Sequence, residues 1–266
     1  MLSPLKKRLG VFTAIAVMAA LVPALVASPA SAAASATTQV KADTTLVEAC
    51  PASASIASAG FTDTTSTDVD CIKYYGVTTG VTATTYEPAG TVTRETMALF
   101  LTRLATAMGV TLGDGSDQDF TDLPTSAASV TAINQIKQLG VTVGTTATTY
   151  SPDDNVTREQ MAMFIERLLT ATAPGPNGSS TDTAAVISGD GTTYNYADID
   201  TGVTYEGHNA IAELYHLGVS DSATGSTAYR PTADITRAEM ATFMTNAMGH
   251  SNARPAGITL QATKNA

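Results

Sequence analysis

Three arginines follow a threonine directly, at points where the sequence predicts that a helix begins. The segments are VTRETM at 92–97, VTREQM at 156–161 and ITRAEM at 235–240, and the arginines are Arg94, Arg158 and Arg237. A cation at a helix N-terminus is disfavoured by about 0.3–1 kcal/mol, because the helix dipole is positive there. A threefold recurrence indicates that these arginines have a role that outweighs this cost.

Anion binding is one such role. A helix N-terminus offers free backbone N–H groups, and the planar fork of a guanidinium matches the two oxygens of a carboxylate or phosphate. The alternative is that each arginine pairs with an acid of the chain itself, namely Asp63, Asp122 or Asp198. Under the first hypothesis Arg237→Ala leaves the stability nearly unchanged, whereas breaking an internal buried pair costs about 3–5 kcal/mol.

The arginines belong to an internal repeat that occurs three times. Each copy opens with an aromatic residue followed two positions later by aspartate, and the copies start at Phe61, Phe120 and Tyr196. A Tyr-x-Pro turn follows, with its proline six positions before the arginine in every copy. The second and third arginines are separated by a Pro/Gly/Ser-rich insertion, which predicts a surface loop.

Each repeat is predicted to contain two helices. In the first helix, apolar residues recur three positions apart and end at a glycine, which is Gly76, Gly140 or Gly218. The second helix begins at an N-cap threonine, which is Thr93, Thr157 or Thr236. Gln160 and Glu239 complete capping boxes, whereas Thr96 does not.

The second helices carry apolar stripes, which Met97, Met161 and Met240 open. Two short helices bury too little surface to fold alone, so the three copies are expected to share one core. The predicted fold class is therefore mainly α, with three helix-loop-helix repeats in one pseudo-threefold domain and, at most, short strands in the turns.

The N-terminus has the features of a secretory signal. Three cations precede an apolar run that is shorter than the roughly 20 residues of a membrane span, and small residues follow it. An uncleaved anchor is the alternative. Cleavage changes the formal net charge from −10 to −13, because the leader carries three cations and no acid. Lys and Arg are few and Trp is absent, which argues against nucleic acid and an anionic membrane surface as partners, and no membrane insertion is expected after cleavage.

Cys50 and Cys71 are the only two cysteines. In an exported chain such a pair predicts a disulfide, which would stabilise a loop of this length by about 3 kcal/mol. Two buried free thiols are the alternative. No further cysteine is present to complete a metal site, and no cofactor is expected.

The ordered recurrence of Phe/Tyr-x-Asp, helix-ending glycine, Tyr-x-Pro and Thr-Arg-(Ala/Glu)-x-Met resembles the S-layer homology (SLH) motif of bacterial cell-envelope proteins. The resemblance covers about residues 48–250. It divides the chain into a leader 1–34, repeats at 48–110, 111–173 and 196–250, a linker insertion 174–195 and a tail 251–266.

The resemblance implies a secreted protein of the cell wall or S-layer. Members of this family bind secondary cell-wall polysaccharides, often pyruvylated, in grooves between motifs. The implied ligand-binding residues are Thr93, Arg94, Thr157, Arg158, Thr236, Arg237 and Glu239. Glu95 and Glu159 depart from the usual alanine and are expected to weaken the first two grooves by pairing with arginine, which favours the third.

Two other roles stand beside wall anchoring. An enzyme is disfavoured because the three histidines lack metal-ligand spacing and no nucleophile motif occurs. An adhesin or a lattice component that associates with its own copies is the second alternative, and the strand-like pattern at 257–263 suits docking or a further module. The acidic stretch 113–122 lacks EF-hand spacing and is interpreted as a solvated linker rather than a calcium site.

Overall fold

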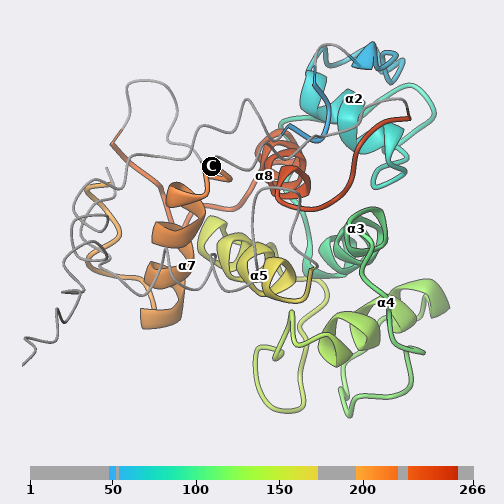
Figure 1. Ribbon diagram of the computed structural model, residues 1–266. Coiled ribbons are helices and arrows are strands. Elements are labelled where there is room, and N and C mark those ends of the chain that lie inside the picture. Colours follow the sequence, from blue (N-terminus) through green and yellow to red (C-terminus); the bar gives the residue numbers. More distant parts are fainter. Residues whose placement is uncertain (1–47, 52–53, 173–195, 221–226, 257–266) are drawn as a thin grey trace, which may run out of the picture. The chain divides into compact units, whose positions relative to one another are not determined.

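The computed structural model describes residues 48–51, 54–172, 196–220 and 227–256 (Figure 1). All of them belong to one compact unit, Gln39–Ala266. The predicted leader 1–34, the linker insertion 174–195 and the strand-like segment 257–263 lie outside the described residues, and they stay predictions.

The described residues are mainly helical, as the sequence predicts. The helices are α2 Thr67–Tyr74, α3 Arg94–Ala107, α4 Ala127–Gln138, α5 Arg158–Thr170, α7 Tyr205–His216 and α8 Arg237–Gly249. In place of strands, isolated antiparallel bridges connect the repeats in this part of the chain: Thr93 with Asn155, Thr157 with Asp234 and Thr91 with Thr236. None of these helices is long and apolar enough to cross a membrane.

The predicted helix ends are confirmed. Gly76, Gly140 and Gly218 follow α2, α4 and α7 with φ of 70°, 75° and 68°, the left-handed conformation that glycine adopts at low cost. At the starts of α3, α5 and α8 each predicted N-cap threonine accepts the backbone N–H three residues on. Capping boxes form in α5 and α8, where Gln160 and Glu239 supply the returning side chain.

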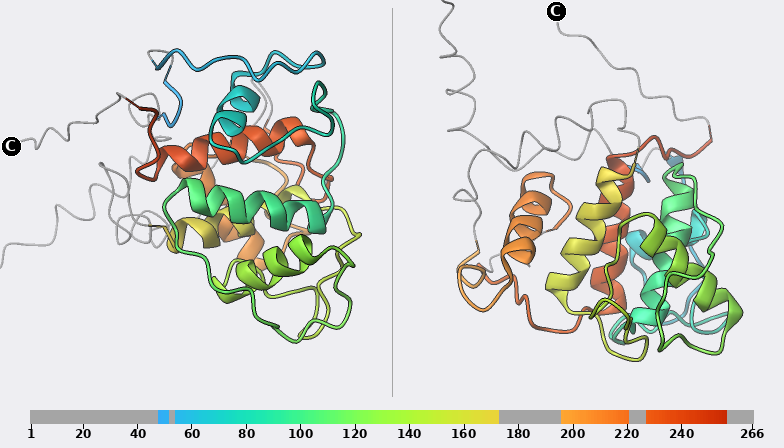
Figure 2. Two further views of the ribbon diagram at one scale, coloured as in Figure 1. Left: turned by 90° about the vertical axis from the view of Figure 1, so that its right-hand side faces the viewer. Right: turned by 90° about the horizontal axis from the view of Figure 1, so that it is seen from below.

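The two helices of one repeat are not each other's main packing partners. Each first helix packs against the second helix of the preceding repeat in cyclic order: α4 against α3, α7 against α5 and α2 against α8. Figures 1 and 2 show these pairs side by side. Each repeat therefore completes its neighbour, and the third repeat connects back to the first.

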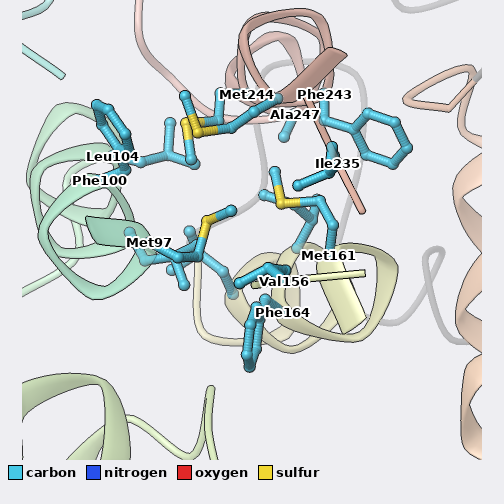
Figure 3. Packing of buried hydrophobic residues seen from close by; sticks show 14 of the residues in the cluster. Met97, Phe100, Leu104, Val156, Met161, Phe164, Ile235, Phe243, Met244 and Ala247 are labelled. Carbon is cyan, nitrogen blue, oxygen red and sulfur yellow. The ribbon is translucent and has the colours of Figure 1, made fainter. Parts of the chain in front are cut away.

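The second helices build the shared core. Helix α8 contacts both α3 and α5. Met97, Met161 and Met244 lie around one centre, together with Leu104 and Val156 (Figure 3). All of these side chains are buried, and each stabilises the fold by about 1.5–3 kcal/mol when it leaves water.

The predicted disulfide between Cys50 and Cys71 is present. It attaches the segment before the first repeat to α2. At the end of α2 the hydroxyl of Tyr75 donates to the carbonyl of Ala49 at 3.0 Å. Burial raises the pKa of the Tyr75 hydroxyl to about 12, and the charge of Arg254 opposes this shift. The entering chain is thus held at α2 by a disulfide and a hydrogen bond.

Candidate functional site

The Tyr-x-Pro turns are fixed by the aspartates that open each repeat. Asp122 accepts the backbone N–H groups of Tyr150 and Ser151, each at 2.7 Å. Asp63 and Asp198 hold the other two turns in the same way. These carboxylates therefore bind backbone N–H groups. The internal-pairing hypothesis requires ion pairs between these aspartates and the arginines, and the described part of the chain contains none.

Each arginine instead binds the turn of the next repeat. The Nε–H groups of Arg94, Arg158 and Arg237 donate to the carbonyls of Tyr150, Tyr229 and Tyr86 at 2.6–2.7 Å. Each tyrosine hydroxyl donates back to the backbone carbonyl of its arginine at 2.8–2.9 Å. We call each reciprocal contact a joint and name it by its arginine.

Aromatic rings hold the guanidinium of every joint. The guanidinium carbon of Arg94 lies 4.6 Å from the ring centre of Tyr150 and 5.6 Å from that of Phe164. The rings of Tyr229 and Phe243 surround Arg158, and those of Tyr86 and Phe100 surround Arg237, at similar distances. Such cation–π contacts contribute about 0.5–2 kcal/mol each and fix the direction of the side chain.

The backbone N–H groups at the helix starts are occupied, which corrects the expectation that they are free for a ligand. Arg94 and Glu95 donate to the carbonyls of Asp154 and Pro152 at 2.8 and 2.9 Å, and the other two joints repeat this pair of bonds. The next N–H group is taken by the N-cap threonine, so Thr93, Thr157 and Thr236 position the helix start. The hydrogen-bond donors of each arginine that these backbone contacts leave over are its Nη1 and Nη2 atoms.

The Nη atoms of the three arginines have different surroundings. Arg94 and Arg237 are 3% and 7% exposed, and the Nη2 atom of each is buried without a hydrogen-bond partner in the structure as described. Burial lowers the pKa of both side chains, yet a guanidinium keeps its charge at neutral pH. Arg158 differs, because its Nη1 lies 3.0 Å from Oε1 of Glu239.

Among the described residues, neither Glu95 nor Glu159 forms an ion pair with its adjacent arginine. Glu159 accepts the backbone N–H and the hydroxyl of Thr204 at 2.8 and 2.7 Å, so it does not pair with Arg158. The carboxylate on Arg158 comes from the third repeat. Sequence reasoning also missed the tyrosines as arginine partners and Arg230 as a second cation on Glu239. The constant spacing of Tyr-x-Pro from the arginine was the available signal.

Comparison with protein-family models bears on what these joints are for. The S-layer homology domain matches residues 119–162 and 195–241. These two matching segments contain Arg158, Tyr229 and Arg237. The first repeat lies outside both segments, although it forms equivalent joints. A comparison with curated proteins found no match.

S-layer homology domains anchor proteins to the cell wall and are not catalytic. The two SLH copies therefore indicate a wall-associated protein of the cell surface. No group of three or more His, Cys, Asp or Glu side chains in the described ranges could hold a metal ion. Each joint presents a guanidinium that a backbone carbonyl and two aromatic rings hold in place.

Proposed function

We propose that the chain is secreted and held at the bacterial cell wall by non-covalent binding of an anionic, pyruvylated secondary wall polysaccharide at its joints. The supporting observation is the unpartnered, buried Nη2 atom of Arg94 and of Arg237. A buried donor of a charged group without a partner is unfavourable by about 1–3 kcal/mol or more. A ligand carboxylate removes this penalty once the side chains that enclose Nη2 shift to admit it, and the rings hold the guanidinium in place before the ligand arrives.

Binding of this kind has to be local and multivalent. The mature chain is acidic, so its overall field does not attract an acidic polymer. Several modest sites on one chain still hold a repeating polymer, because the second contact forms at a high effective concentration. A pyruvate ketal supplies one carboxylate for each sugar that carries it, which suits sites that recur along a polymer.

The test is sedimentation of the mature chain with purified cell walls. Three wall preparations are compared: intact, treated with mild acid to remove ketals, and stripped of the secondary polymer. We expect retention on intact walls and its loss on the other two. Undiminished binding to stripped walls would refute the proposal and indicate peptidoglycan or nonspecific adhesion.

A matched set of variants assigns the binding to the joints. Lysine keeps the charge of Arg94 and Arg237 but loses the fork, so the double variant Arg94→Lys, Arg237→Lys should lower retention at least about tenfold. Arg103→Lys is the control, because Arg103 lies on α3 and contacts the carbonyl of Val77 outside the joints. Equal retention of the double variant and the control would remove the joint arginines from the site.

A further inference from the structure

The Arg158 joint contains an anion that belongs to the chain itself. Oε1 of Glu239 lies 3.0 Å from Nη1 of Arg158 and also contacts Nη2 of Arg230. A glutamate carboxylate is the same chemical group as the acid of a pyruvate ketal. Glu239 therefore brings to Nη1 of Arg158 the same kind of group that a ligand would bring to this guanidinium.

The capping box of α8 holds Glu239 in this position. Its second oxygen, Oε2, accepts the backbone N–H and the hydroxyl of Thr236, both at 2.9 Å. Burial alone would raise the pKa of Glu239, but the Thr236 N–H and the charge of Arg158 outweigh that effect and lower it. The carboxylate is thus ionised at neutral pH and bound on both oxygens.

The other two joints have no such group. By the repeat, Gln160 corresponds to Glu239 at the Arg94 joint, and Thr96 corresponds to it at the Arg237 joint. Gln160 is neutral and completes its own capping box. Glu239 contacts Nη1 of Arg158, and among the described residues no carboxylate forms an ion pair with Arg94 or Arg237.

We propose that Glu239 is an internal competitor that occupies the anion position of Arg158, so that the chain offers two wall-polymer sites, at Arg94 and Arg237, rather than three. This inference rests on the proposed function. A carboxylate on the same chain loses no translational freedom when it binds, so a free ligand of the same chemistry competes poorly with it.

Two reciprocal substitutions test the proposal. Glu239→Gln keeps the capping box, since glutamine fulfils that role in α5, but removes the charge from Arg158. Gln160→Glu places the same carboxylate beside Arg94. The probe is a methyl glycoside that carries a pyruvate ketal, and calorimetric titration of the mature chain counts the sites. Thermal unfolding confirms that each variant is folded.

We expect about two sites in the parent, about three in Glu239→Gln and about one in Gln160→Glu. In the Glu239→Gln background, Arg158→Lys should abolish the gained site and return the count to about two. Three sites in the parent, or weaker binding in Glu239→Gln, would overturn the inference and leave the proposed function intact, since Glu239 would then be part of a working site. Absence of probe binding in every variant would overturn both.

Discussion

The side chain of each joint arginine has an inner and an outer part with different tasks. In Arg237 the inner Nε bonds to the carbonyl of Tyr86, and the flat guanidinium lies between two rings. The Nη2 atom at the far end of the side chain is buried and has no hydrogen-bond partner among the described residues. Stability and recognition therefore depend on different atoms of one residue, and a substitution can separate them.

Arg237→Ala should lower the free energy of unfolding by about 3 kcal/mol, because it removes a charge-assisted hydrogen bond and two cation–π contacts. The sequence alone favoured a nearly unchanged stability for a ligand-binding arginine. Arg237→Lys should cost clearly less, since an ammonium still reaches the Tyr86 carbonyl and the rings. Urea unfolding of both variants measures the difference. A change below about 0.5 kcal/mol for alanine would contradict the structural role of the joint.

The sequence predicted the type and register of the joint residues but not their contacts. The threonine caps and the two capping boxes follow from residues three positions apart, which any helix start brings together. The pairing of Arg158 with Glu239 depends on two helix starts in different repeats. No local pattern contains that contact, so the sequence assigned the competing carboxylate to the adjacent Glu159.

At the scale of elements, the interface of α5 and α7 contains an unusual acid. Glu213 of α7 is 3% exposed, and its Oε1 is buried without a hydrogen-bond partner in the described structure. Burial raises its pKa to about 8, and the charge of Glu166 on α5 adds to this shift. A neutral, protonated Glu213 is therefore the form that this interface accommodates.

The contribution of Glu213 to the free energy of unfolding should fall as the pH rises from about 4.5 to about 8. Below this window Glu213 is protonated in both states; within it the unfolded chain releases a proton that the folded chain retains, which favours unfolding. Glu213→Gln should remove this loss, on the order of 2 kcal/mol, and so gain stability relative to the parent at pH 8 but not at pH 4.5. Urea unfolding at both pH values is the measurement.

Glu206→Gln is the control for that experiment, because Glu206 is exposed and pairs with Arg167 at the surface. Glu206→Gln should change the free energy of unfolding only slightly, and it should not gain stability over the parent at pH 8 as Glu213→Gln does. If Glu213→Gln and the parent lost stability in parallel between pH 4.5 and 8, the acid would not titrate in the interface as described.

Helix ends were predictable, whereas helix partners were not. Gly140 ends α4 because of its own backbone freedom, and this property is visible in the sequence. The apolar spacing of α4 shows which face is buried. It does not show that α3 of the preceding repeat, rather than α5 of its own, covers that face.

At the scale of the whole molecule, the cyclic order of the joints makes every repeat a structural part of the other two. Removal of the first repeat exposes the face of α4 that α3 covers and the face of α8 that α2 covers. It also removes the carbonyls of Tyr86 and Gly90, which bind Arg237. The two SLH copies alone therefore lack parts of their own core.

A fragment that starts at residue 111 should accordingly show a helical signal without a cooperative thermal transition. Repeats two and three alone leave the apolar faces of α4 and α8 uncovered. Far- and near-ultraviolet circular dichroism during heating tests this expectation. Addition of a separate chain that contains residues 35–110 should restore the transition. A fragment that melts cooperatively near the Tm of the parent would show that the cycle is not needed for folding.

The attachment of the entering chain to α2 has a mechanical consequence. A pull on residue 48 passes through the covalent Cys50–Cys71 bond to α2, and α2 packs against α8. A pull on residue 256 enters beyond the end of α8 and runs along that helix toward Arg237 at its start. Tension on either end of the domain is therefore transmitted through the same pair of helices, the pair that connects the third repeat back to the first.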